Sequence, residues 1–103
     1  MELKDKVVVV TGAGQGLGRQ FALGCAENGM KIALADMNPE KLEKTRKECE
    51  DMGAEARGYE LNVTEESAVE SVYSQIVRDF GTLDATINNA GILRDSLLVK
   101  VKD

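Results

Sequence analysis

The sequence predicts an α/β fold built on a parallel β-sheet. Short apolar runs of strand length alternate along the chain with longer amphipathic segments of helical length. The connections between them are short, and the resulting order β-α-β-α-β-α-β is typical of a parallel sheet with right-handed crossovers. The 103 residues suit a single domain, because domains most often contain about 100–150 residues.

Four segments are predicted to be strands. Residues 7–10 are consecutive valines, and such a β-branched run without polar alternation is typical of a strand covered on both faces. Residues 32–35 form a second apolar run, residues 59–63 alternate as a third strand, and residues 83–87 form a fourth. Residues 92–101 fit either a loop or the beginning of a helix.

Helices are predicted between these strands, over residues 17–28, 39–52 and 65–80. Asn38 before a proline predicts the cap of the second helix. Thr64 is expected to cap the third, with two glutamates near its positive end. The expected core-facing stripes are Leu17, Phe21 and Cys25; then Leu42, Thr45, Cys49 and Met52; then Val69, Val72, Tyr73, Ile76 and Phe80.

Composition excludes several classes of function. The chain has 13 Lys and Arg against 18 Asp and Glu, a formal charge of −5, and it has no His. A net negative charge argues against binding to nucleic acid or to an anionic membrane. The absence of His removes the usual zinc ligand and general base. Without a membrane span or a signal-peptide core, we expect a soluble, cytoplasmic protein. Cys25 and Cys49 are expected to be reduced, buried residues.

The strongest motif is glycine-rich and lies where the first predicted strand turns into the first helix. It follows the pattern T-G-x-x-x-G-x-G, and it fits neither a strict G-x-G-x-x-G nor a P-loop. Small residues at a helix N-terminus let backbone N–H groups approach a diphosphate. The motif predicts a dinucleotide site, although a plain tight turn is the alternative. The candidate residues are Gly12, Gln15, Gly16, Leu17 and Gly18.

A carboxylate follows at the end of the second predicted strand. Asp36 lies 18 residues after Gly18, close to the offset of about 20 residues at which an acidic side chain binds ribose hydroxyls. Its charge favours NAD and repels the 2′-phosphate of NADP. Gln15 is neutral, no basic residue directly follows Asp36, and Lys41 lies within the next helix. A solvated strand end is the alternative reading of Asp36.

Taken together, these motifs resemble the short-chain dehydrogenase/reductase family over essentially the whole chain. Asn62-Val63 stands where the family usually has Asp-Val beside the adenine, and residues 88–91 match its N-N-A-G signature. The resemblance implies a Rossmann-type, doubly wound sheet with strand order 3-2-1-4. It also implies cofactor contacts from Asn62, Val63, Asn89, Ala90 and Gly91. Residues 91–98 are similar to the corresponding segment of the 3-oxoacyl-carrier-protein reductases and related hydroxyacyl dehydrogenases.

The resemblance implies an NAD(H)-dependent oxidoreductase that acts on a secondary alcohol or ketone and is a homo-oligomer when intact. The family's catalytic Ser, Tyr and Lys would follow Asp103, so residues 1–103 are expected to be the dinucleotide-binding portion, with no catalytic residue. Alone, this portion is expected to be inactive and poorly soluble or partly unfolded, because residues 83–87 would form an open sheet edge. The alternatives are a non-catalytic nucleotide-binding or interaction module and, less favoured, a Rossmann-type methyltransferase.

Overall fold

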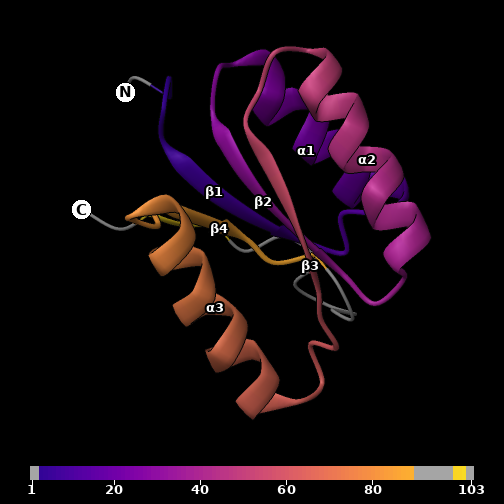
Figure 1. Cartoon of the computed structure of the whole chain (residues 1–103), viewed down its shortest axis with the longest axis vertical. Helices are drawn as coiled ribbons and strands as arrows, with labels where there is room; N and C mark the ends of the chain where they lie inside the picture. Colours follow the sequence, from indigo (N-terminus) through magenta and orange to yellow (C-terminus); the bar gives the residue numbers. More distant parts are fainter. Residues whose placement is uncertain (1–2, 90–98, 102–103) are drawn as a thin grey trace.

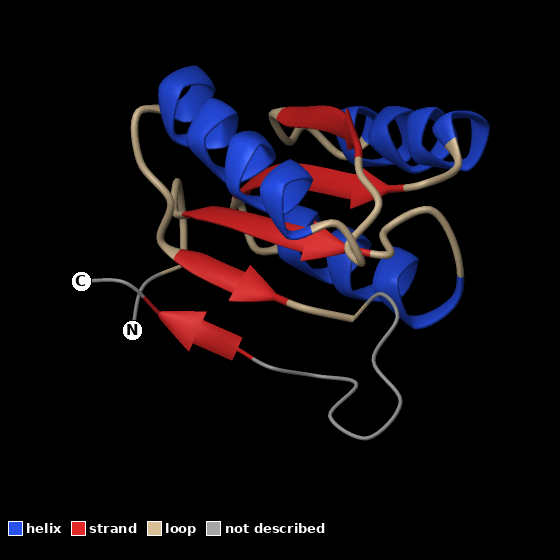
Figure 2. Ribbon diagram, turned by 90° about the horizontal axis from the view of Figure 1, so that it is seen from below, coloured by secondary structure: helices blue, strands red, loops and turns tan. Residues whose placement is uncertain are grey.

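A computed structural model describes residues 3–89 and 99–101 of the chain as one twisted sheet with helices on both faces (Figures 1 and 2). The strands lie in the order β3-β2-β1-β4-β5. The first four pair in parallel, which confirms the α/β class and the order 3-2-1-4. The strands are β1 (Val7–Thr11), β2 (Lys31–Asp36), β3 (Ala56–Glu60), β4 (Ala85–Ile87) and β5 (Val99–Val101). The helices are α1 (Gly16–Glu27), α2 (Pro39–Asp51) and α3 (Glu66–Phe80).

Two hydrophobic clusters lie on opposite faces of the sheet. Helices α1 and α2 cover one face and α3 covers the other (Figure 1). Val8 and Val10 belong to the larger cluster, on the side of α1 and α2, whereas Val7 and Val9 belong to the smaller one beneath α3. All four valines are at most 1% exposed. The prediction of a strand buried on both faces is therefore confirmed.

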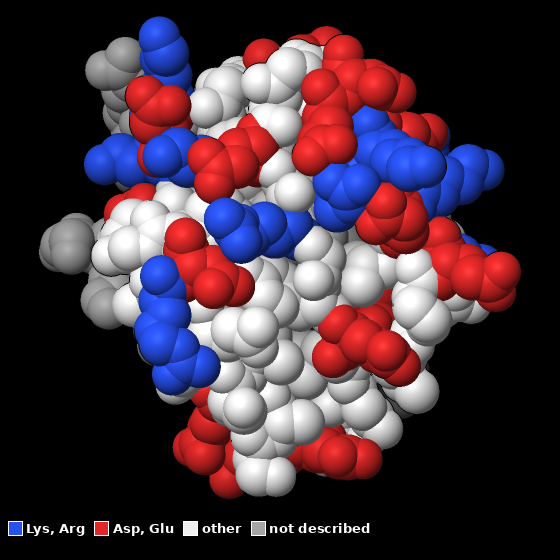
Figure 3. Space-filling model, viewed as in Figure 1, with Lys and Arg blue, Asp and Glu red and all other residues white. Residues whose placement is uncertain are grey.

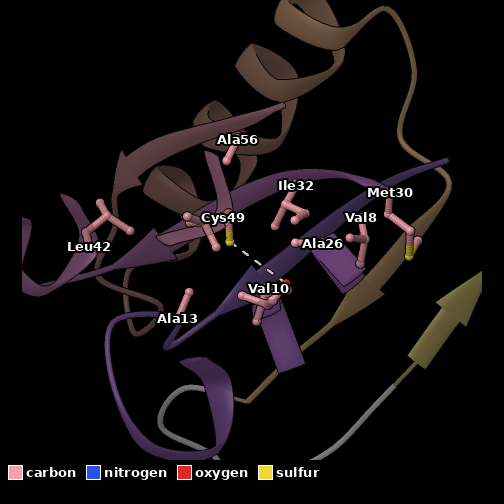
Figure 4. Packing of buried hydrophobic residues seen from close by; sticks show 11 residues of the cluster. Val8, Val10, Ala13, Ala26, Met30, Ile32, Leu42, Cys49 and Ala56 are labelled. Atoms are coloured by element: carbon pink, nitrogen blue, oxygen red, sulfur yellow. Dashed lines mark hydrogen bonds between the residues drawn. The ribbon is translucent and has the colours of Figure 1, made fainter. Parts of the chain in front are cut away.

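The larger cluster joins α1 and α2 to the sheet, as the close view in Figure 4 shows. Ile32 and Leu34 of β2 are fully buried in it, and Cys49 of α2 lies at its centre. The Cys49 thiol lies 3.9 Å from the carbonyl oxygen of Ala22 in α1. Cys49 is thus buried, as expected, while Cys25 is half-buried, and both are free thiols.

Helix α1 places small residues at its most buried positions, next to part of the predicted stripe. Its buried residues are Gly18, Ala22 and Ala26, whereas Leu17 is 50% exposed and Phe21 is half-buried. Phe21 and Cys25 of the predicted stripe still pack against the larger cluster, so the prediction was wrong for Leu17 alone. Small residues take the most buried positions because α1 passes close to the end of β1. Only small side chains fit between such closely packed elements.

The other helices follow their predicted stripes with two exceptions. In α2 the Asn38 side chain accepts hydrogen bonds from two N–H groups of the first turn, which confirms the cap. Met52, however, follows the last turn and is 45% exposed, so it lies outside the core. The predicted Thr64 cap was also wrong: Glu65 precedes α3 without a side-chain cap. Ile76 is the fully buried residue of α3, and the remainder of its predicted stripe is partly buried.

The fourth parallel strand is not an open edge in the described part of the chain. Val99–Val101 form β5, which pairs antiparallel with β4 (Figure 2). For these three residues the expectation of a loop or helix was wrong, and so was the expectation of an edge at residues 83–87. Backbone groups along a strand require partners, and a Val-Lys-Val segment suits that pairing. Residues 92–98 lie outside the described residues.

The third strand begins and ends earlier than the alternation predicted. β3 spans Ala56–Glu60, so Leu61 and Val63 follow it instead of belonging to it. Leu61 is nevertheless buried, 3% exposed, and its N–H donates a hydrogen bond to the carbonyl oxygen of Asp36 at the end of β2. This contact brings the segment after β3 to the same edge of the sheet as the end of β2. Among the described residues, no helix has the length and apolar character needed to span a membrane.

Candidate nucleotide site at the carboxyl edge of the sheet

The glycine-rich turn joins the end of β1 to the first turn of α1. Gly12 and Gly16 have φ angles of +66° and +58°, a conformation that residues with a Cβ adopt rarely. A Cβ added to Gly18 would lie 2.0 Å from the carbonyl oxygen of Gly12. The helix therefore begins directly against the end of the strand, with no room for a side chain between them.

The N-terminus of α1 lacks the side-chain acceptors and acidic residues that usually bind the first N–H groups of a helix. Gln15 occupies the cap position without a side-chain hydrogen bond, and the first turn contains no acidic residue. The leading N–H groups of a helix have no partner within the helix and carry a partial positive charge. This end of α1 can therefore accept an anionic group of a ligand.

Asp36 lies beside this turn at the end of β2. One of its carboxylate oxygens accepts a hydrogen bond from the N–H of Gly14 at 2.8 Å, and the other accepts one from the N–H of Asn38 at 2.9 Å. A carboxylate offers about four acceptor positions, so two N–H donors leave room for hydroxyl donors. The structure thus brings together the glycine motif and the carboxylate that the sequence placed 18 residues apart.

Lys41 also reaches the turn, which sequence reasoning did not foresee. Its ammonium group donates a hydrogen bond to the side-chain carbonyl oxygen of Gln15. The only available signal was its position as the third residue of α2. The direction of its side chain depends on how α2 packs against α1, and no local pattern encodes that packing.

A pocket of about 350 Å³ is lined by the residue that follows Asp36 and by the segment after β3. Met37 lines it and is 62% exposed, a large apolar side chain open to a ligand. Asn62 lines it too, and its side-chain oxygen accepts hydrogen bonds from the N–H and the hydroxyl of Thr64. Those bonds orient the amide of Asn62, whose NH₂ group can donate to a ligand. The half-buried Val63 follows in the chain and is not among the lining residues.

The end of β4 is fastened to the end of β1 through the hydroxyl of Thr11. This hydroxyl donates to the side-chain oxygen of Asn88 at 3.0 Å and accepts from the N–H of Asn89 at 2.8 Å. The side-chain nitrogen of Asn89 would lie 3.0 Å from a Cβ on Gly18, so it faces the glycine-rich turn. Ala90 and Gly91, the other predicted contacts from this motif, lie outside the described residues.

The tyrosine and cysteine side chains with raised pKa values among residues 3–89 serve the packing of the core. Burial raises the pKa of the Tyr59 hydroxyl, which donates to Asp79 at 2.7 Å, and burial also raises the pKa of Tyr73. Burial raises the pKa of Cys25, and of Cys49 to about 11, so neither thiol is activated. In the part of the chain that the structure describes, no group of three or more His, Cys, Asp or Glu could hold a metal ion.

Ion pairs lie between α1 and α2 and within α2. Arg19 of α1 forms a two-pronged pair with Glu48 of α2, with nitrogen–oxygen distances of 2.9 and 2.6 Å. Arg46 pairs with Glu43 and Glu50 within α2. Figure 3 shows basic side chains lying among acidic ones on this face, with no extended patch of one sign. The Arg19–Glu48 pair joins α2 to α1, the packing on which the position of Lys41 near the turn depends.

Comparison with known proteins gives a consistent result. A sequence model described as short chain dehydrogenase matches residues 6–103. The 3-oxoacyl-[acyl-carrier-protein] reductase of Thermotoga maritima is 37% identical over 103 residues, which cover 100% of this chain and 42% of the reductase. The chain therefore spans about two fifths of the length of this curated relative.

Solved structures share the fold over the same region. NAD⁺-bound xylitol dehydrogenase aligns with a TM-score of 0.85 and 47% identity, over 89% of this chain and 35% of that one. A short chain dehydrogenase/reductase from Burkholderia phymatum, in complex with NAD, aligns with a TM-score of 0.85 and 37% identity, over 89% of this chain and 33% of that one.

Proposed function

The chain belongs to the short-chain dehydrogenase family, and from this membership we propose that it is the NAD-binding part of an oxidoreductase. The reaction would move a hydride between the nicotinamide and a secondary alcohol or ketone. The observation that carries the proposal is the meeting of three groups at Gly14: a strand-to-helix turn, an uncapped N-terminus of α1 and the carboxylate of Asp36.

The residues of the turn fit a dinucleotide. The close approach of Gly18 to Gly12 leaves a backbone surface where a diphosphate could meet the N–H groups of α1, with Gln15, Gly16 and Leu17 around it. Leu17 is 50% exposed at this point, as suits an apolar contact with the cofactor. When bound, NAD would supply the redox chemistry, and the protein's contribution is binding and orientation.

The adenosine end would occupy the groups around Asp36. We assign the ribose hydroxyls to the free acceptor positions of Asp36, and the adenine to the pocket lined by Met37 and Asn62. A contact from Val63, the next residue in the chain, rests on the family resemblance. Asn89 would border the cofactor from the side of β4, and the cofactor contacts proposed for Ala90 and Gly91 rest on the family resemblance. The negative charge of Asp36 supports NAD over NADP, because the 2′-phosphate would meet it as a like charge. The NAD in both structural neighbours agrees with this preference.

Binding measurements on the protein that contains this chain test the proposal. NADH should bind more tightly than NADPH. Asp36→Ala should weaken NADH binding and reduce the difference between the NADH and NADPH affinities. Asp51→Ala is the matched control, because it removes an exposed carboxylate at the far end of α2. A clear preference of the unmodified protein for NADPH would contradict the assignment of Asp36.

For the substrate, we propose a ketone of the 3-oxoacyl class. Identity of 37% to a 3-oxoacyl-[acyl-carrier-protein] reductase across all of this chain supports that class. The sequence contains no Tyr followed four residues later by Lys, so residues 1–103 alone would bind a nucleotide without catalysing its reaction. Oxidation of NADH on addition of a 3-oxoacyl thioester tests this proposal, and failure with every such thioester would refute it.

Two further parts of the proposal concern the protein in the cell. Its acidic balance and two free cysteines favour a reducing, cytoplasmic environment. The family resemblance favours a homo-oligomer, which light scattering on the intact protein would test. A monomer at micromolar concentration would contradict that assignment.

A further inference from the structure

We propose that Lys41 determines how strictly the ribose site excludes a 2′-phosphate, because its side chain starts next to the carboxylate of Asp36 and its ammonium group reaches Gln15 at the glycine-rich turn. The inference rests on the proposed nucleotide site. In this arrangement the carboxylate of Asp36 repels the phosphate, while the ammonium group of Lys41, held by a neutral amide at the neighbouring turn, could bind it.

The stem of Lys41 is fixed by the same backbone that binds Asp36. A Cβ added to Gly14 would lie 2.9 Å from the Cβ of Lys41 and 2.9 Å from a carboxylate oxygen of Asp36. The N–H of Lys41 donates to the side chain of Asn38 at 3.0 Å, and the N–H of Asn38 donates to the other carboxylate oxygen of Asp36. The two side chains therefore start from adjoining points at one corner of the site.

The ammonium group of Lys41 has a neutral partner. It donates to the side-chain carbonyl oxygen of Gln15, and none of the ion pairs described in residues 3–89 includes Lys41. An ammonium group has three donors, so the amide of Gln15 leaves two for a ligand. Both side chains are exposed and free to turn toward a bound ribose.

Stability of α2 does not explain a lysine at this position. Lys41 lies in the first turn, where the helix macrodipole disfavours a cation and favours an acidic residue such as the neighbouring Glu40. The contact with Gln15 spans from α2 to the cap of α1, across the mouth of the glycine-rich turn. A cation held there, against the local dipole, is suited to an anionic ligand.

It follows that the negative charge of Asp36 is the main obstacle to binding the 2′-phosphate of NADPH. Asp36→Asn removes the negative charge but keeps an acceptor oxygen for the N–H of Gly14 or Asn38. The variant should bind NADPH at least about tenfold more tightly than the unmodified protein does. The increase in NADPH affinity should require Lys41. Adding Lys41→Met to Asp36→Asn should lower NADPH affinity by about fivefold to tenfold.

The experiment measures NADPH and NADH affinity by calorimetry at fixed salt, on the protein containing this chain. It uses the unmodified protein, Asp36→Asn, and Asp36→Asn combined with either Lys41→Met or Lys47→Met. Lys47→Met is the matched control, because it removes the same charge from the same helix about 9 Å further from the turn. It should change NADPH affinity less than twofold. Urea midpoints of all variants establish that each is folded.

A second measurement leaves Asp36 intact. NADPH should displace bound NADH only weakly from the unmodified protein, and Lys41→Met should weaken that displacement further, with a larger fold-change in NADPH affinity than in NADH affinity. Equal NADPH affinity with and without Lys41, or an equal loss from Lys47→Met, would overturn the role of Lys41. An unmodified protein that binds neither nucleotide would instead refute the proposed function, and the inference with it.

Discussion

Adding one methyl group at Gly18 should damage both the fold and the nucleotide site. The Cβ of Gly18→Ala would lie 2.0 Å from the carbonyl oxygen of Gly12 and 2.7 Å from its carbonyl carbon. Real Cβ contacts below 3.0 Å essentially do not occur, so the turn and the helix must separate by at least about 1 Å. The obstacle is backbone, which cannot rotate away as a flexible side chain would.

The expected loss of stability follows from two opposing effects. Overpacking of a well-packed region costs about 1–3 kcal/mol. Replacing a helical glycine by alanine returns up to about 1 kcal/mol, through helix propensity. Since the clash involves backbone, we expect a net decrease of about 1–2 kcal/mol in the free energy of unfolding. NADH affinity should fall as well, because the N–H groups of α1 move with the helix.

Urea unfolding and NADH titration measure these effects, with Gly24→Ala as the control. Gly24 lies in the same helix, and a Cβ there would have no atom within 4 Å. Its substitution should stabilise the protein by up to about 1 kcal/mol and leave NADH binding unchanged. If Gly18→Ala were as stable as Gly24→Ala, the close approach of α1 to β1 would not constrain the fold, and the reasoning would fail.

Two Thr→Val substitutions should have opposite effects on urea unfolding. At Thr11 the change removes the hydroxyl that bonds Asn88 and Asn89, so stability should fall by about 1–3 kcal/mol; an unchanged midpoint would contradict this. At Thr45 the buried hydroxyl has no hydrogen-bond partner in the described structure, so stability should rise by about 0.5–1 kcal/mol, and a clear loss would contradict it. The Cys49 thiol has a pKa raised from 9.0 to about 11, so its stabilising contribution is complete below pH 9 and is lost as the pH rises through 11. The free energy of unfolding of Cys49→Ala should therefore fall less steeply over that range than that of the unmodified protein, and parallel curves would contradict the shift.

The sequence predicted those features that depend on local patterns. Residues 7–10 indicated a doubly covered strand because valines without polar alternation suit no other environment, and Asn38-Pro39 marked the start of α2 because cap and ring chemistry are local. The meeting of Asp36 with the glycine-rich turn was also predictable. Parallel strands end at one edge of a sheet, so motifs at successive strand ends converge there.

The features that sequence reasoning missed depend on distances between elements. The inward face of α1 is set by its approach to β1, which selects Gly18 and Ala22 over the larger Leu17. The pairing of β4 with Val99–Val101 is a long-range choice that no local signal marks. The place of Lys41 at the turn follows from the packing of α2 on α1, so it became visible only in three dimensions.

The pairing of β1 with strands on both sides has a consequence for how the protein is made. Its partner β2 follows within the first 36 residues, whereas β4, on its other side, is joined to it through contacts 77 residues apart, between Val7 and Asp84 and between Thr11 and Asn88. Since the N-terminal part of a chain leaves the ribosome first, Gly14 and Asp36 can meet early in synthesis. The amide of Asn89 joins them only after the crossover through α3 has returned the chain to the middle of the sheet.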